Sequence, residues 1–359
     1  MKYRATKSLA PSLISILAGL LIGAVVILMS GENPLLVYYA MIVQPLSNLK
    51  NILNVLYVIT PLIIVGLAFV IAIKSGMINI GLEGQMLLGA MAGTFVATLF
   101  PALPWYIYIP IIMLASMIVG ALWALLPGYL KMKFGASEIV TCIMLNYIAE
   151  YLINYIISSG LFKHAKIAQR TPYILENAHF ISVSEIGSRM DTLAMRGVQL
   201  NGMFIIALVL VVLVYILMKK TKMGYKMRAV GQNINATTAN RMNSKKIMLI
   251  AMGISGGIAG LAATGEVLGT FNGFVEGFSP GYGFAGISVA LLGRNHPLGV
   301  VLAAIFFGIL NQGMIYIGAN SSIPRDFVKI LQTFIIIFII ISPYVEEKWL
   351  EFTKKKSIA

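Results

Sequence analysis

Amide and carboxylate side chains stand among glycines in residues 76–85 (GMINIGLEGQ), between two long apolar runs. Hydrocarbon cannot hydrogen-bond an interrupted backbone, so such a segment at membrane depth must be surrounded by protein or by a water-filled cavity. We therefore expect Asn79, Glu83 and Gln85 to line or shape a pathway through a membrane. Glu83 has an alternative interpretation, because a carboxylate at this position would also cap the N-terminus of the following helix.

A second polar set lies in the apolar segment 137–158. Asn146, Glu150 and Asn154 follow one another at intervals of about one helical turn, so they share one face of a helix. A charge at mid-bilayer costs about 2.5–3.5 kcal/mol on insertion scales, so Glu150 should face protein or water. One interpretation is a polar stripe that lines the pathway. The other is a polar contact between helices, or a position of Glu150 near the outer end of its helix.

Four more residues are lining candidates. Asn311 and Gln312 lie inside the apolar segment 298–318, where a hydrogen bond between helices is the alternative. Phe271 and Phe274, with Glu266 before them and Phe278 after them, could form an aromatic, hydrogen-bonding outer vestibule. Aromatic residues are also common at membrane boundaries without any function, so that alternative stays open.

Motifs for catalysis are absent from the sequence. There is no phosphate-binding loop of the form Gly-x-x-x-x-Gly-Lys-Ser/Thr, so the chain itself is not expected to hydrolyse ATP. Histidine, cysteine and carboxylates show no metal-ligand spacing. The single cysteine, Cys142, lies in an apolar run and is interpreted as a packing residue. We predict no catalytic residue, no metal and no cofactor.

The composition excludes a soluble globular protein. Of 359 residues, 58% are apolar and 11% are charged, against roughly 45–50% and about 25% in soluble domains. The formal net charge is +14, but the basic residues occur in short clusters between apolar runs. A nucleic acid requires a continuous basic surface, so we do not expect a nucleic acid as a partner. The expected partner of the apolar runs is the lipid bilayer.

The apolar runs predict an all-α integral membrane fold of about ten transmembrane helices. A crossing needs about 20 mostly apolar residues. The third and eighth segments adjoin glycine-rich stretches and are interpreted as broken or re-entrant helices. The ten segments are 9–29, 52–73, 83–100, 107–126, 137–158, 201–218, 246–265, 281–293, 298–318 and 326–342. In the seventh, two overlapping Gly-xxx-Gly pairs indicate close helix packing.

The distribution of Lys and Arg predicts the orientation. With the N-terminus inside, 19 of these residues fall on the inner side and 8 on the outer side. Positive residues prefer the cytoplasmic side, which places both termini in the cytoplasm after an even number of crossings.

We expect one transmembrane domain over residues 1–359, built from two halves, 1–160 and 201–345. The glycine-rich stretch before the third segment has an echo in residues 280–286, before the eighth. A repeat of five segments inverts the second half, and interrupted segments at matching places indicate a pathway near the midplane. Residues 160–200 form an extracytoplasmic loop, which either docks an external partner or is a disordered or covering loop. Residues 219–246 form a basic cytoplasmic connection.

Three runs resemble the permease subunits of bacterial ABC importers of the ribose and branched-chain amino acid type. They are residues 76–90 (GMINIGLEGQMLLGA), residues 138–149 (EIVTCIMLNYIA) and residues 223–233 (MGYKMRAVGQN), followed by Ala236. The resemblance extends over about residues 10–345. It is nearest to the nucleoside-uptake subgroup, for which the second run is the main indication.

The resemblance implies a bacterial inner-membrane protein with three partners: a homologous second permease, a cytoplasmic ATP-binding subunit and an extracytoplasmic substrate-binding lipoprotein. It also implies that the cytoplasmic connection 219–246 contacts the ATPase. The residues carried over to this contact are Gly224, Arg228, Gly231, Asn233 and Ala236. The expected mechanism is alternating access, driven by the different affinities of ATP for two states of the complex.

A nucleoside suits a pathway that is rich in amides and poor in charge. A simple sugar such as ribose suits it almost as well. An ion-coupled secondary transporter is the alternative from another class, since it also uses inverted halves and broken helices. It would need intramembrane carboxylates for the driving ion, and only Glu83 and Glu150 qualify.

Overall fold

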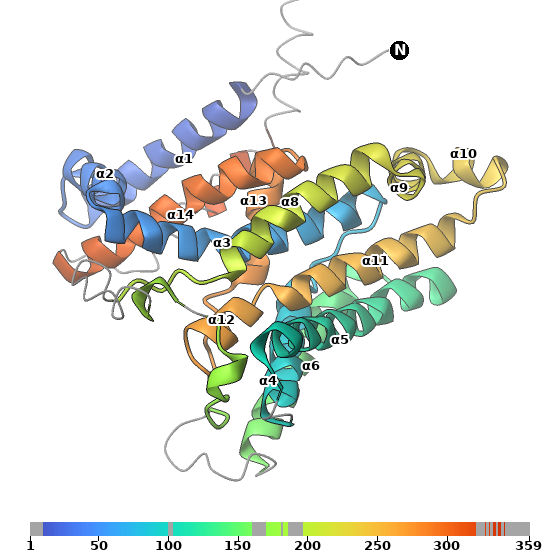
Figure 1. Cartoon of the computed structure of the whole chain (residues 1–359). Helices are drawn as coiled ribbons and strands as arrows, with labels where there is room; N and C mark the ends of the chain where they lie inside the picture. Colours follow the sequence, from blue (N-terminus) through green and yellow to red (C-terminus); the bar gives the residue numbers. More distant parts are fainter. Residues whose placement is uncertain are drawn as a thin grey trace, which may run out of the picture. The chain divides into compact units, whose positions relative to one another are not determined.

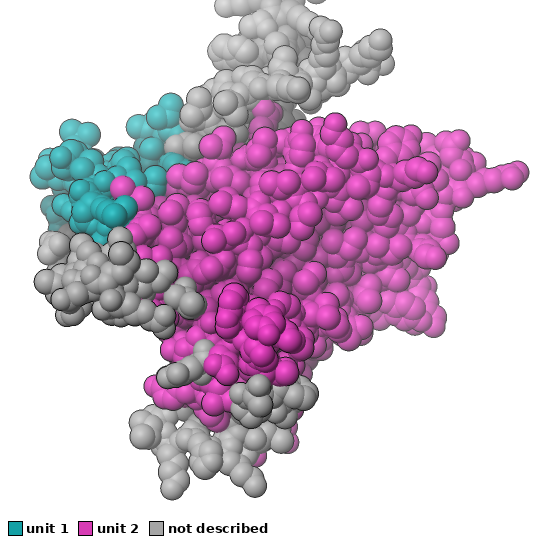
Figure 2. Space-filling model, in the orientation of Figure 1, with its two compact units in different colours: residues 1–51, 306–359 teal, residues 52–305 magenta. Residues whose placement is uncertain are grey.

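The computed structural model describes most of the chain, in two compact units. The described residues are 10–99, 103–159, 170–180, 182–185 and 197–320, with seven separate positions between 327 and 341. Unit 1 comprises Met1–Asn51 and Phe306–Ala359, and unit 2 comprises Ile52–Ile305 (Figure 2). Within the described residues the regular structure is helical, and the only β-pairs are the isolated bridges Arg170–Val275 and Ser182–Asn201.

Unit 2 holds most of the helices. They are α4 (Leu82–Leu99), α5 (Trp105–Phe134), α6 (Glu138–Ser158), α8 (Met203–Lys220), α9 (Lys222–Gln232), α10 (Ile234–Ala239), α11 (Ser244–Leu261), α12 (Thr264–Gly269) and α13 (Tyr282–Leu292), with the 3-10 turn η2 (Glu176–Ala178). Two further helices, α3 (Leu49–Lys74) and α14 (Pro297–Asn320), have residues in both units.

Unit 1 contains α1 (Ala10–Met29), α2 (Pro34–Val43) and the 3-10 turn η1 (Gln44–Leu46). The hydroxyl of Tyr38 on α2 donates to the carbonyl of Leu20 on α1 at 2.6 Å. A Cβ added at Gly313 would lie 2.8 Å from the Cα of Met41, so the unit 1 part of α14 approaches α2 closely. The first contact joins α1 to α2, and the second joins the unit's two separate stretches of sequence.

The predicted helical character of the chain is confirmed for the described residues. Each predicted segment from 9–29 to 298–318 contains a helix. Six stretches are long and apolar enough to cross a bilayer, namely Leu49–Lys74, Trp105–Phe134, Glu138–Ser158, Met203–Lys220, Ser244–Gly269 and Pro297–Gly318. The number of ten crossings and the inversion of the halves stay predictions, and most of 326–342 lies outside the described residues.

Two helices of unit 2, α5 and α11, are held together by glycines. α11 and α5 run side by side (Figure 1). A Cβ added at Gly120 of α5 would lie 2.9 Å from the Cα of Gly260 on α11, and one added at Gly256 would collide with Ala124. Small residues let two helix backbones approach this closely. The predicted packing function of the Gly-xxx-Gly pairs is therefore confirmed for this face.

Candidate functional site

Two helices of unit 2, α4 and α13, begin inside the molecule after an interruption. The segment 75–81 before α4 is not helical, and Gly76 has a φ of +79°. Gly281, directly before α13, has a φ of +96°. Both values lie in the left-handed region that favours glycine. The predicted interruption is present, although Glu83 and Gln85 already belong to the first turns of α4.

Two buried amides enclose the interruption before α4. The Nδ2 of Asn79 donates to Gln85 Oε1 and to Ser255 Oγ, both at 2.9 Å. Gln85 Nε2 donates back to Asn79 Oδ1 at 2.9 Å, and the same oxygen accepts from the backbone N–H of Gly81 at 3.1 Å. Ser255 Oγ donates to the carbonyl of Ala68 at 2.7 Å. This cluster ties the non-helical backbone to α3 and α11, which replaces hydrogen bonds that a continuous helix would make.

Asn146 joins α6 to the same interruption. Its Oδ1 accepts from the backbone N–H of Gly84 at 2.9 Å, and its Nδ2 donates to the carbonyl of Ile80 at 3.0 Å. The thiol of Cys142, one turn earlier on α6, donates to Asn79 Oδ1 at 3.8 Å. Cys142 is buried and free. Asn146, the first residue of the predicted polar stripe on α6, therefore makes a contact between helices.

Glu83 connects the start of α4 to the start of α13. Ser279 Oγ donates to its Oε1 at 2.6 Å, and the backbone N–H of Gly283 donates to its Oε2 at 2.5 Å. Ser279 Oγ also accepts from the N–H groups of Gly281 and Tyr282, both at 3.2 Å. A carboxylate is favourable at the positive end of a helix. A cap therefore exists, but it lies on α13, which comes about 200 residues after Glu83 in the chain.

A cavity of about 340 Å³ adjoins this contact. Its volume falls within the roughly 300–1,000 Å³ that small-molecule sites occupy. All of its lining residues belong to unit 2, from α4, α6, α13 and the loop before α13. They are Glu83, Leu87, Ile143, Asn146, Tyr147, Glu150, Ile153, Asn154, Phe274, Glu276, Gly277, Ser279, Gly281 and Phe284.

The lining combines hydrogen-bonding groups with aromatic rings. Carboxylates and amides come from α4, α6 and the loop, and the rings are those of Tyr147, Phe274 and Phe284. No lysine, arginine or histidine is among the described residues that line the cavity. A solute with a flat apolar face and several hydroxyl or amine groups could stack and hydrogen-bond here, whereas an anion would meet three carboxylates and no cation among the described lining residues.

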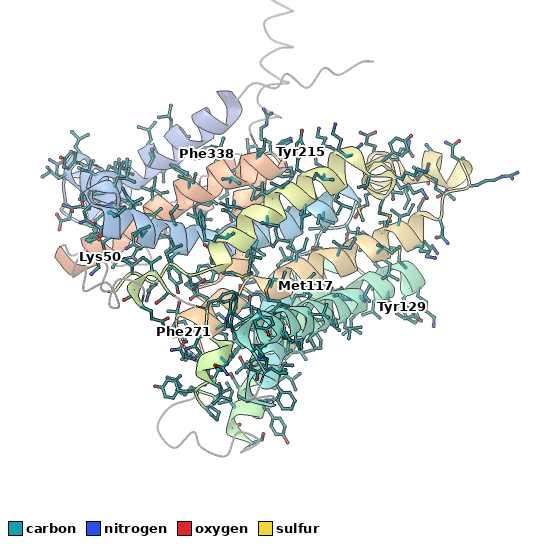
Figure 3. The ribbon with its side chains drawn as sticks, viewed as in Figure 1. Lys50, Met117, Tyr129, Tyr215, Phe271 and Phe338 are labelled. Atoms are coloured by element: carbon teal, nitrogen blue, oxygen red, sulfur yellow. The ribbon has the colours of Figure 1, made fainter. Side chains whose placement is uncertain are left out.

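Of the residues predicted to line a pathway, Glu83, Asn146, Glu150 and Phe274 line this cavity. Phe271 does not; its ring lies 6.2 Å from that of Phe278, measured between centroids (Figure 3).

Asn79 and Gln85 are buried in their own cluster beside the cavity, without lining it. Asn311 and Gln312 lie on the unit 1 part of α14, where Gln312 is buried. A pathway function for these four residues stays a prediction.

Two residues of the cavity lining were not predicted from the sequence. Glu276 and Ser279 lie in the loop before α13, where the predicted vestibule named only the phenylalanines and the preceding Glu266. Glu266 on α12 is buried and accepts a hydrogen bond from the hydroxyl of Tyr57 on α3. These two residues are 209 positions apart, so no spacing within one helix could associate them.

The segment 219–246, which was predicted to be cytoplasmic, forms α9 and α10. A Cβ added at Gly224 would lie 2.8 Å from the Cα of Met218 at the end of α8. One added at Gly231 would lie 2.9 Å from the carbonyl carbon of Lys74 and 3.0 Å from the backbone nitrogen of Gly76. The two glycines thus seat α9 against the end of α8 and against the start of the interruption that leads to α4.

The other residues assigned to ATPase contact have local structural functions. Asn233 ends α9 and caps α10, with its Oδ1 accepting from the N–H of Ala236 at 3.0 Å. Arg228 lies in the middle of α9, and its Nη1 is buried without a hydrogen-bond partner among the described residues. The cap at Asn233 separates two short helices, as an Asn N-cap does.

Part of the predicted external segment packs on α12 and on the loop between α12 and α13. The backbone N–H of Thr171 donates to the carbonyl of Phe274, and that of Phe180 donates to Leu268, both at 2.9 Å. Tyr173, between them, is 70% exposed. The positions 163, 164, 189 and 191, which also carry charged or histidine side chains, lie outside the described residues.

A bundle of apolar helices with a polar cavity beside two interrupted helices has the architecture of a membrane permease. The sequence comparisons agree. The chain belongs to the family described as branched-chain amino acid transport system / permease component, whose model matches residues 51–340. It is a multi-pass membrane protein and a transport component.

Three relatives match nearly the whole chain. The nucleoside ABC transporter permease protein NupB of Lactococcus lactis subsp. cremoris is 33% identical, over 96% of this chain and 94% of its own. The guanosine ABC transporter permease protein NupP of Bacillus subtilis is 37% identical, over 94% of each chain. The glucose ABC transporter permease protein TsgB13 of Haloferax volcanii is 31% identical, over 92% of this chain and 87% of its own. No solved structure matches the chain.

Proposed function

We propose that the chain is the membrane subunit of an ATP-driven nucleoside importer in the bacterial inner membrane, with both termini in the cytoplasm. The observation that carries the proposal is the full-length similarity to permeases named for nucleoside and guanosine transport. ATP hydrolysis takes place in a partner, because the chain has no phosphate-binding loop.

The chemistry of the cavity supports a neutral, aromatic solute. A nucleoside base can stack on the ring of Phe284, which is 49% exposed, while its sugar hydroxyls bond to Asn154 or Glu150. Glu83 is not free for the solute in this state, because both of its oxygens bind the start of α13. We infer that the cavity is one half of the translocation pathway.

The second half of the pathway is assigned to a homologous permease subunit. On α6, next to the cavity, Tyr147, Tyr151 and Tyr155 are 55%, 70% and 66% exposed and follow one another at one-turn spacing. Exposed tyrosines that share a helix face are typical of protein interfaces. In this proposal, the partner permease packs on that stripe and closes the cavity.

Coupling to the ATPase proceeds through α9. The ATPase docks on α9 and α10, and the Gly231 contact with Lys74 and Gly76 passes the movement to the interruption before α4. Glu83 then carries it to α13 through Ser279 and Gly283. Because α4 and α13 correspond in the two proposed inverted halves, a shift of one against the other provides alternating access.

The external segment 160–200 is assigned to the substrate-binding lipoprotein. Its described part packs on the loop that supplies Phe274 and Glu276 to the cavity, and it exposes Tyr173 on the surface. Docking there would act directly on the cavity's outer wall.

A simple sugar is the second candidate substrate, because the Haloferax volcanii relative is named for glucose. Both candidates can be tested in cells that express the chain with its partners. We expect excess unlabelled nucleosides to abolish uptake of labelled guanosine, and excess glucose or ribose to leave it unchanged. Cells that lack only this chain are the control. Uptake that sugars inhibit and nucleosides do not would contradict the nucleoside assignment.

A further inference from the structure

We propose that Lys74, Lys219 and Arg228 form a binding site for the phosphate of an anionic phospholipid. The site lies at the end of the helix bundle that carries α9, and its assignment to the cytoplasmic leaflet rests on the proposed function. No part of the transport pathway is required for it.

The backbone contacts of α9 place Arg228 between two helix ends. Gly224, Arg228 and Gly231 are four and three residues apart, so they share one face of α9. Gly224 contacts the end of α8, and Gly231 contacts Lys74 at the end of α3. Arg228 therefore lies on the face that bridges α8 and α3, where Lys219 and Lys74 are its neighbours.

The three cations lack a counter-charge in the described part of the chain. Residues 219–246 contain no Asp or Glu. The only ion pair among the described residues joins Lys131 and Glu138. The Nη1 of Arg228 is buried without a hydrogen-bond partner among the described residues. Three cations in one place repel one another, so an anion that binds all of them is favoured.

The position of the cluster favours a lipid over a soluble phosphate. Lys74 is the last residue of α3 and Lys219 is the penultimate residue of α8, and both helices are apolar enough to span a membrane. Such positions lie at the level of the headgroups. An exposed apolar stripe on α8 leads to Lys219 and offers a surface for an acyl chain; it consists of Val209, Val212, Leu213 and Ile216.

Lipid retention tests the proposal. The permease, purified from a membrane with equal amounts of phosphatidylglycerol and phosphatidylcholine, is analysed by native mass spectrometry. We expect the wild type to retain phosphatidylglycerol preferentially, and the variant K74Q/K219Q/R228Q to lose most of that enrichment. The control is K222Q/K226Q, which removes two exposed lysines from α9 and should keep the enrichment.

Several outcomes would overturn the proposal. They are an absence of lipid preference in the wild type, equal retention by the triple and control variants, displacement of the lipid by excess inorganic phosphate, and displacement by the ATPase subunit. The variant R228K keeps the charge and checks folding, since it should retain most of the bound lipid. Because the readout is bound lipid, failure of nucleoside uptake would not alter the result.

Discussion

Buried amides at the start of α4 bond to protein atoms on every side. Asn79 and Gln85 bond to each other and to Ser255, and Asn146 bonds to the backbone of α4. An interrupted helix leaves backbone groups without partners, and each one costs roughly 1–3 kcal/mol if it stays buried and unsatisfied. These side chains therefore hold open the break on which the cavity depends.

The first prediction concerns Asn146. Asn146→Ala leaves the carbonyl of Ile80 and the N–H of Gly84 without their partner. We expect a loss of about 1–3 kcal/mol in stability, measured as a lower thermal unfolding temperature of the purified permease. Asn154→Ala is the matched control, since Asn154 is on the same helix, lines the same cavity and has no hydrogen bond within the described residues. Equal losses in the two variants would contradict the bridging function of Asn146.

The second prediction concerns Glu83. Glu83→Gln replaces one acceptor oxygen by an NH2 group, which cannot accept from Gly283 or Ser279. Hydrogen bonds to charged groups are worth about 1.5–3 kcal/mol, so we expect lower thermal stability together with slower uptake. Glu276→Gln is the control, because Glu276 lines the cavity without a bond to the described residues. If the two variants behave alike, Glu83 does not join α4 to α13.

For single residues, the sequence indicated which side chains are important, but it did not indicate which residues they contact. Glycines beside Asn79, Glu83 and Gln85 marked the interruption, because few other residues accept such a backbone. The partners Ser255 and Ser279 come from about 180 to 200 residues further along the chain. Ordinary serines in apolar or loop segments give no local signal of that kind.

Among the elements, α9 has the most specific function in the proposal. Its glycines allow backbone contact with the ends of α8 and α3, so a movement of α9 has no soft side chain to absorb it. The extent of the long helices could be predicted from the length of the apolar runs. The helices α9 and α10 could be predicted less well, because a short amphipathic helix resembles a loop in composition. The division of residues 244–269 into α11 and α12 has no break signal in the sequence.

The third prediction concerns this contact. Gly231→Ala places a methyl group against the carbonyl of Lys74, which must displace α9 from the interruption. We expect the assembled complex to keep at least half of its ATPase rate while nucleoside uptake per ATP falls at least fivefold. The measurement compares hydrolysis and uptake in the same vesicles. Gln232→Ala, at the exposed next position, is the control and should leave the ratio unchanged. A normal ratio in Gly231→Ala would exclude α9 as the coupling element.

The described part of the molecule contains a cavity, and the sequence has no phosphate-binding loop. The family and the absence of a phosphate-binding loop both followed from the sequence, because glycine-rich motifs of this kind are local. The cavity did not, since its walls come from α4, α6 and the loop before α13. The proposed substrate, the pairing with a second permease and the orientation in the membrane are properties of the assembled transporter. They can be tested only when the partner proteins are present.

Reconstitution tests the central claim most directly. The permease pair is placed in vesicles with and without the ATPase, with the binding lipoprotein outside, ATP inside and labelled nucleoside outside. We predict uptake only when both ATPase and ATP are present, with no ATPase activity in this chain alone. Uptake by this chain without the ATPase, driven by an ion gradient, would contradict the account.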